Sequence, residues 1–184
     1  EYFSSAMILP NDNIIISGYK TVKDKFSMKN SIMAIINNEP NNRKKKKSFV
    51  NMLDQEGENK WEVSPSEDEE NHIAFTTFLS DQIFMVGQKS TRFNGNGDAW
   101  LISLDTNGRK KWEESYGGRG SDGGNYAIKV SDGGYIMVGY TDAYGNGMND
   151  IWLIKTDFTG EKEWSQVYGG KKDDYGWGVT ETFD

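Results

Sequence analysis

The stretch Asp98–Gly118, DAWLISLDTNGRKKWEESYGG, returns 52 residues later as Asp150–Gly170, DIWLIKTDFTGEKEWSQVYGG. The two copies align without a gap and are identical at 11 of 21 positions. A fixed period of roughly 40–50 residues is typical of a solenoid or a propeller. The repeat therefore predicts a protein built from successive copies of one structural unit.

Each unit contains the signals of four short strands. In the best-defined copy the expected strands are Tyr126–Ser131, Tyr135–Thr141, Asp150–Thr156 and Glu163–Tyr168, and the Asp132-Gly133-Gly134 turn joins the first two. Glycine accepts the positive φ that such hairpin turns require. Four short strands repeated at regular spacing predict an all-β fold, a partial β-propeller of four-stranded antiparallel blades.

We expect residues 1–184 to form one β-propeller segment. Its blade repeats cover about 1–64, 71–118 and 122–170, and a fourth starts at 173–184. The first copy has about 18 additional residues between its second and third strands, predicted as an insertion loop over about 21–47, because insertions in repeat proteins map to surface loops. Closed propellers have roughly four to eight blades. Three copies and the start of a fourth therefore need missing blades or a partner to complete a ring.

A D-x-x-G-x-x-x-W spacing occurs in all three copies and suggests how they pack. Asp and Gly form the turn after the third strand, and a tryptophan follows four residues beyond the glycine. Such a ring buries on the order of 150–250 Å² and is predicted to pack between neighbouring blades. The tryptophans at this position are Trp61, Trp112 and Trp164.

Two further positions recur along the repeat. An aromatic residue marks the third strand of each copy, at Phe49, Trp100 and Trp152. Small residues occur in the first strands, as expected for innermost strands that crowd around an axis: Ala6, Ala74, Ala127, Gly176 and Gly178.

The elements D-G-G-Y, W-L-I-K-x-D, D-x-x-G-x-x-x-W and Y-G-G together resemble the roughly 50-residue repeats of secreted bacterial and archaeal β-propeller proteins. The turn and its tryptophan also resemble the tryptophan-docking motif of pyrroloquinoline-quinone-like propellers. The resemblance covers nearly the whole chain and is strongest over residues 71–170. It implies a propeller that is often extracellular or cell-surface and usually a binding or structural module. It does not imply quinone dependence, because most propellers with such blades bind no quinone, and the vicinal cysteines and metal-ligand carboxylates expected near such a cofactor are not identified here.

Composition excludes several classes of function. The formal net charge is −7, which argues against general binding to a phosphate backbone. Cysteine is absent, so the chain has neither disulfides nor a thiolate metal site. The sequence contains no apolar run of about 18 residues, the length that would predict a membrane span.

Four groups of residues are candidates for a site. Calcium could bind the oxygen-rich loops 95–98 and 145–150, although these also suit simple turns and do not match the EF-hand pattern. His72, the only histidine, has no cysteine or second histidine as a partner, and we expect it at the start of a strand or in a loop.

The other two groups are charged. The carboxylates of Asp173-Asp174 and of Glu67–Glu70 could serve as acid and base, but solvated inter-blade loops explain them better. The cations of Arg43–Lys47 could dock on an acidic partner, an anionic membrane or nucleic acid, or simply be a solvated insertion. We assign no catalytic, cofactor or metal residue from the sequence.

The leading hypothesis is a non-enzymatic propeller module that contacts another protein, or a glycan, within a larger assembly, because open strand edges rarely stay bare. The alternative is the propeller domain of a hydrolase or quinone-type oxidoreductase whose site lies in missing blades. A purely architectural component of a filament or surface layer is a third reading. An extracellular or cell-surface location is favoured, and an intracellular or ciliary assembly is the alternative.

Overall fold

A computed structural model describes residues 2–23, 44–65, 71–90 and 96–182. Within these ranges the chain is all-β, with no helix and three four-stranded antiparallel sheets. The first sheet consists of β1 (Tyr2–Ile8), β2 (Ile14–Lys23), β3 (Lys44–Leu53) and β4 (Asn59–Val63). The second consists of β5 (His72–Leu79), β6 (Gln82–Ser90), β7 (Gly97–Leu104) and β8 (Lys110–Tyr116). The third consists of β9 (Asp122–Lys129), β10 (Tyr135–Thr141), β11 (Asp150–Thr156) and β12 (Lys162–Tyr168).

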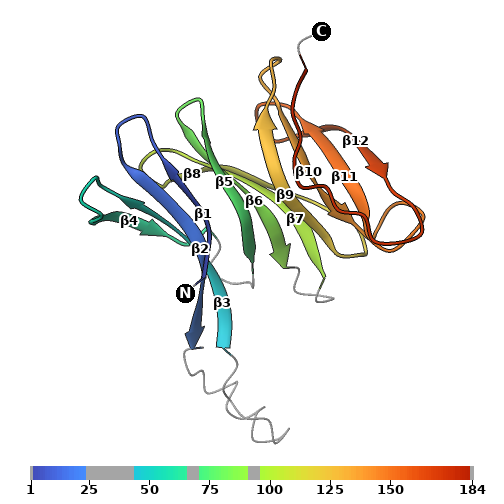
Figure 1. Ribbon diagram of the computed structural model, residues 1–184, viewed down its shortest axis with the longest axis horizontal. Coiled ribbons are helices and arrows are strands. Elements are labelled where there is room, and N and C mark those ends of the chain that lie inside the picture. Colours follow the sequence, from blue (N-terminus) through green and yellow to red (C-terminus); the bar gives the residue numbers. More distant parts are fainter. Residues whose placement is uncertain (1, 24–43, 66–70, 91–95, 183–184) are drawn as a thin grey trace, which may run out of the picture.

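Every sheet is a meander in which each strand pairs with the next one in sequence. Figure 1 shows the three sheets side by side in chain order, with the first strand of each sheet against the sheet before it. Strand β5 packs on β1, β2 and β3, and β9 packs on β5, β6 and β7. One repeat of sequence therefore makes one sheet, and neighbouring repeats pack face to face.

The register confirms the alignment of the worn first copy with the other two. Gly18 pairs with Phe49, Gly87 with Trp100 and Gly139 with Trp152. At Gly139 an added methyl group would lie 1.8 Å from the carbonyl oxygen of Gly123, so the position has no room for a side chain. The glycine thus lets the neighbouring strand approach while an aromatic ring lies beside it.

Two hydrophobic cores fill the spaces between sheets. The first lies between the first and second sheets and includes Ile15, Val50, Ile73 and Trp100. The second lies between the second and third sheets and includes Phe84, Leu101, Ala127, Met137 and Trp152. Each core therefore lies between two neighbouring sheets rather than within one sheet.

The structure differs from two expectations for individual segments. Strands β2 and β3 continue as a paired hairpin as far as Lys23 and Lys44, so both ends of the range predicted as an insertion loop are strand. Residues 24–43 lie outside the described residues. The predicted crowding of small residues in first strands is correct for Ala127 and Gly176, which are buried, and wrong for Ala6 and Gly178, which are exposed.

Candidate functional site

The three D-x-x-G turns share one backbone design. Asp54, Asp105 and Asp157 each accept two backbone N–H groups of their own turn through Oδ1. The glycines that follow, Gly57, Gly108 and Gly160, have φ of +84°, +77° and +90°. The same local sequence therefore builds the same turn three times, and any difference between the turns comes from what lies against them.

The first junction is made by Trp61 of β4, which lies against the turn of the second sheet. Its indole Nε1 donates to the carbonyl oxygen of Thr106 at 3.2 Å. A methyl group added at Gly108 would lie 3.1 Å from Cε3 of the same ring. The prediction that this tryptophan packs between neighbouring repeats is confirmed here.

The second junction has the same arrangement, shifted by one repeat along the chain. Trp112 of β8 packs beside both Phe84 and Tyr135, with ring centroids 5.8 and 5.9 Å away. A methyl group at Gly160 would lie 2.7 Å from Cζ3 of Trp112. Tyr116 donates its hydroxyl to the carbonyl oxygen of Gly160 at 2.5 Å. One outer strand thus supplies an indole and a phenol to the turn of the next sheet.

An ordinary tyrosine hydroxyl is protonated at physiological pH, and burial extends the range over which the Tyr116 hydroxyl remains a donor. Tyr116 is 6% exposed. Burial, helped by the charges of Glu114 and Asp157, raises the pKa of Tyr116 well above its usual range. The phenol stays protonated at every physiological pH and holds the turn of the third sheet.

The same two positions in the third sheet are open. Trp164 and Tyr168 of β12 are 41% and 55% exposed. We call these two residues the open face. Among the residues that the structure describes, most of the large exposed hydrophobic side chains lie on the third sheet and the segment after it, and one, Ile8, lies on the first sheet. Those near the third sheet are Tyr144, Met148, Phe158, Trp164, Tyr168, Tyr175 and Trp177. The molecule is thus unequal at its two ends, although the repeats are alike.

A second aromatic group lies beside the third sheet. Tyr140 contacts Tyr175 edge to face at 5.2 Å, and Tyr175 lies 6.4 Å from Trp177. Asn149 donates to the hydroxyl of Tyr175 at 2.8 Å and to Asp173 at the same distance. These contacts hold the segment after β12 against the third sheet, while the Trp177 ring remains exposed.

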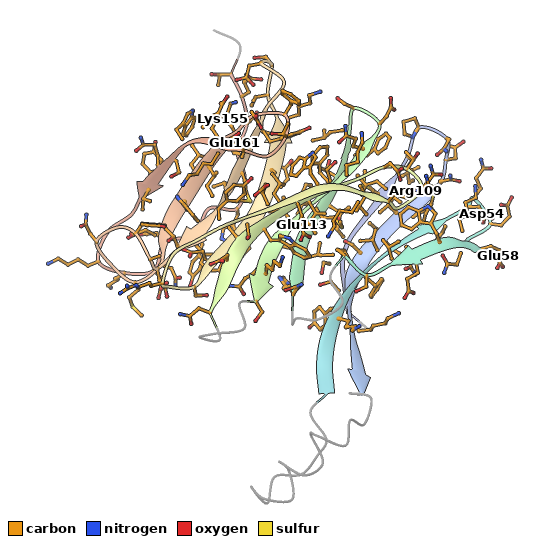
Figure 2. All side chains as sticks on the ribbon, turned by 180° about the vertical axis from the view of Figure 1, so that it is seen from behind. Asp54, Glu58, Arg109, Glu113, Lys155 and Glu161 are labelled. Carbon is orange, nitrogen blue, oxygen red and sulfur yellow. The ribbon has the colours of Figure 1, made fainter. Side chains whose placement is uncertain are left out.

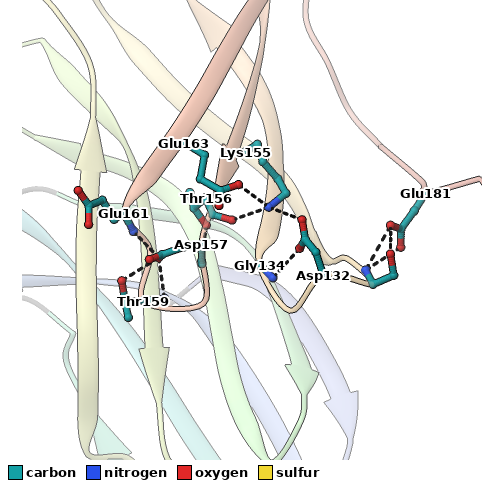
Figure 3. A network of polar contacts seen from close by, with 10 residues as sticks. Asp132, Gly134, Lys155, Thr156, Asp157, Thr159, Glu161, Glu163 and Glu181 are labelled. Carbon is teal, nitrogen blue, oxygen red and sulfur yellow. Dashed lines mark hydrogen bonds and ion pairs between the residues drawn. The ribbon is translucent and has the colours of Figure 1, made fainter.

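Lys155 is the most deeply buried cation of the described chain, and it is fully paired. Figure 3 shows its Nζ between Asp132 at 2.9 Å, Glu163 at 2.8 Å and the carbonyl oxygen of Thr156 at 2.9 Å. Burial alone would lower the pKa of Lys155, but its hydrogen bonds with Glu163 and Asp132 outweigh burial and raise it. A permanently charged amine with three acceptors is a structural tie and not a nucleophile.

Lys155 also ties the first hairpin of the third sheet to its outermost strand. Gly134 lies so close that an added methyl group would be 2.6 Å from Nζ. The lysine holds the pKa of Asp132 below its usual range, and the backbone N–H of Gly134 contributes to the same shift. Sequence reasoning missed this site; its signal was a lysine in an otherwise apolar strand, where the second copy has Ser103.

The loops proposed for calcium use their carboxylates locally. Asp150 accepts the backbone N–H of Asn146 at 3.0 Å, and a methyl group at Gly169 would lie 1.9 Å from its Oδ1. In the earlier loop Gly95 is outside the described residues, and Asn96 donates to the carbonyl oxygen of Arg119. Among the residues that the structure describes, no group of three or more His, Cys, Asp or Glu side chains could hold a metal ion.

A carboxylate pair lies at the junction of the second and third sheets. A methyl group at Gly117 would lie 2.1 Å from Oδ1 of Asp98 and 2.8 Å from Oδ2 of Asp122. Asp122 is fully buried and accepts the N–H of Gly118 at 2.9 Å. Burial raises the pKa of both carboxyls, and the Asp98 charge adds to the shift at Asp122. The pair constrains the Y-G-G segment to glycine.

The remaining candidates lie apart from one another. His72 begins β5, as expected, and its ring lies 6.1 Å from that of Tyr19. Asp173 accepts from Asn149, and Asp174 accepts from Gly170. Residues 67–70 are outside the described ranges, as is Arg43, while Lys44–Lys47 lie in β3. No acid–base arrangement brings the described members of this group together.

Comparison with protein-family models finds no matching family, and comparison with curated proteins finds no match. The described residues include no helix long and apolar enough to cross a membrane.

Proposed function

We propose that this chain is a segment of a β-propeller and acts as a non-enzymatic binding or scaffold module in a larger assembly. The observation that carries the proposal is the exposure of Trp164 and Tyr168, whose counterparts Trp112 and Tyr116 cover a neighbouring turn. Large exposed aromatic side chains grouped on one surface mark interaction sites. Asp150 accepts the backbone N–H of Asn146, and Asp173 accepts from Asn149, a local use of these carboxylates that also favours binding over catalysis.

The propeller arrangement is supported by the way the sheets follow one another. Each sheet places its first strand against the preceding sheet, and its outer strand reaches the turn of the next one. If each further sheet were placed on the preceding one in this way, the sheets would be arranged around their first strands, as the blades of a propeller are. Figure 2 places Asp54 and Glu58 at one end of this array and Lys155 and Glu161 at the other.

The proposal is tested on the native protein, purified under non-denaturing conditions, by native mass spectrometry with light scattering. We expect a particle heavier than the 20.8 kDa of this sequence. Within it, Trp164→Ser should weaken the assembly, whereas Ile8→Ser, which changes an exposed side chain on the first sheet, should not. A 20.8 kDa particle at all concentrations, unaffected by either substitution, would contradict the proposed function.

A further inference from the structure

The junctions between sheets define what the open face should bind. In both complete junctions an outer-strand tryptophan covers a positive-φ glycine of the next sheet's D-x-x-G turn, Trp61 on Gly108 and Trp112 on Gly160. In the second junction a tyrosine also donates to the carbonyl oxygen of that glycine. Trp164 and Tyr168 present the same indole and phenol one repeat later.

The first strand of a further sheet is already represented beside the third sheet. Gly124 of β9 fits against Val86, where a methyl group would lie 2.5 Å from Cγ1. Gly176, one period later, fits against Val138 in the same way at 2.3 Å, and its N–H donates to the carbonyl oxygen of Gly139 at 3.1 Å. Residues 174–182 therefore occupy the place that β9 occupies against the second sheet.

A carboxylate makes the same local contact at both places. Asp122 accepts the N–H of Gly118 at 2.9 Å, and Asp174 accepts the N–H of Gly170 at 2.9 Å. Glu181 is held further along by Ser131, whose N–H donates to Oε2 at 2.9 Å (Figure 3). The segment is thus fixed along its length, and its outer side is placed for strand pairing as β9 is placed for β10.

We propose that the open face, together with residues 174–182, is the docking surface for three further strands that complete a fourth sheet of the same repeat. This inference rests on the proposed function and names its partner. The occupant pairs with residues 174–182 and lays an Asp-x-x-Gly turn on Trp164. The carbonyl oxygen of its turn glycine accepts the hydroxyl of Tyr168, as Gly160 accepts that of Tyr116.

A second copy of the chain fits this surface less well. Its first sheet could offer the uncovered turn at Gly57, where an added methyl group would meet nothing within 4 Å. However, that sheet already contains its own first strand, β1, which would need the place that residues 174–182 occupy. The surface therefore fits strands that lack a first strand of their own, because residues 174–182 already occupy that position.

The test extends the full chain with its own sequence. Asp184 stands one period after Asp132, so a copy of residues 133–170 attached directly after Asp184 continues the repeat in register. The copy carries phenylalanine at its own tryptophan position 164, so that the original Trp164 can be followed in a distinct peptide. Hydroxyl-radical footprinting with mass spectrometry then measures the oxidation rate of Trp164, and hydrogen exchange reports whether the added strands fold.

We expect the oxidation rate of Trp164 to fall to that of Trp112 in the extended chain, with exchange protection in the added strands. A matched extension with Gly160→Val in the copy, whose branched side chain is incompatible with the positive φ, should leave Trp164 as reactive as in the original chain.

Three results would overturn the inference. The first is a reactive Trp164 beside a protected extension, and the second is an extension that stays unprotected while the first three sheets remain protected. The third is protection of Trp164 in the original chain that rises with protein concentration, because a second copy would then be the occupant. These results leave the broader function standing if the native particle is large, whereas a native 20.8 kDa monomer counts against that function itself.

Discussion

Replacing Gly160 with alanine, with Gly57→Ala as a matched control, measures what the tryptophan junction contributes to stability. Both glycines close the same turn, with φ of +90° and +84°. In both turns the aspartate accepts two backbone N–H groups. The two sites differ in their surroundings: a methyl group at Gly160 would lie 2.7 Å from the Trp112 ring, whereas one at Gly57 has no neighbour within 4 Å.

The structure separates the cost into two parts. An alanine forced into the left-handed region costs about 1–2 kcal/mol, and this cost is common to both variants. Overpacking against the Trp112 ring adds about 1–3 kcal/mol at Gly160 alone. We therefore expect Gly57→Ala to lower the free energy of unfolding by about 1–2 kcal/mol and Gly160→Ala to lower it by about 2–5 kcal/mol.

Urea denaturation followed by far-ultraviolet circular dichroism measures both values without relying on tryptophan fluorescence. A double-mutant cycle with Trp112→Ala supplies the decisive comparison. Once the ring is removed, Gly160→Ala should cost no more than Gly57→Ala does in the wild type. Equal costs for the two glycine variants, or an unchanged cost of Gly160→Ala without the ring, would refute the docking of Trp112 on this turn.

Three further substitutions test other parts of the structure. Gly139→Ala should lower the free energy of unfolding by about 1–3 kcal/mol or abolish folding, because its methyl group would lie 1.8 Å from a backbone carbonyl oxygen of β9. The control Gly178→Ala should change the stability by no more than about 1 kcal/mol. Similar melting temperatures for the two variants would contradict this prediction. Asp122→Asn should raise stability at pH 7 by about 1 kcal/mol. Because the pKa of Asp122 is raised, its ionised carboxylate destabilises the fold above that pKa, and this destabilisation disappears as pH falls through the pKa. The stability gained by Asp122→Asn should therefore shrink on acidification. A gain that grows on acidification would contradict the prediction. Lys155→Met should lower the free energy of unfolding by about 1.5–3 kcal/mol, against about 0–1 kcal/mol for Lys110→Met at an exposed position. Because the pKa of Lys155 is raised, the advantage of the wild type should persist at neutral pH and vanish only as pH rises through that raised pKa. Equal costs for the two substitutions at neutral pH would rule out a stabilising role of the Lys155 ion pairs.

Much of the local structure could be predicted because it depends on residues close together in the chain. The D-x-x-G turns form wherever an aspartate can accept nearby N–H groups and a glycine can take a positive φ. The alignment of Gly18 with Gly87 follows from the spacing of apolar strands, and the register of β2 with β3 agrees with it. Hairpin pairing between consecutive strands is likewise a short-range property.

The candidate site was predictable only in part. The spacing indicates that Trp61, Trp112 and Trp164 share one role, and the first two do pack against a neighbouring turn. It does not distinguish Trp164, because the exposure of a side chain depends on atoms that lie far away in the sequence. Lys155 differs from Trp164, because its acceptors lie within one repeat: Thr156 is the next residue and Glu163 is on the paired strand, while Asp132 comes from the first hairpin of the same sheet.

The sequence by itself determined the repeat, its period, the four strands of each unit and the turns between them, because each depends on contacts within about one repeat. Only the tertiary structure decided which of the equivalent positions are covered: Tyr116 is buried under the third sheet, while Tyr168 and Trp164 face outward. The physical reason is that burial is a property of the neighbouring surface. Identical residues in successive repeats differ only in what the next sheet brings to them.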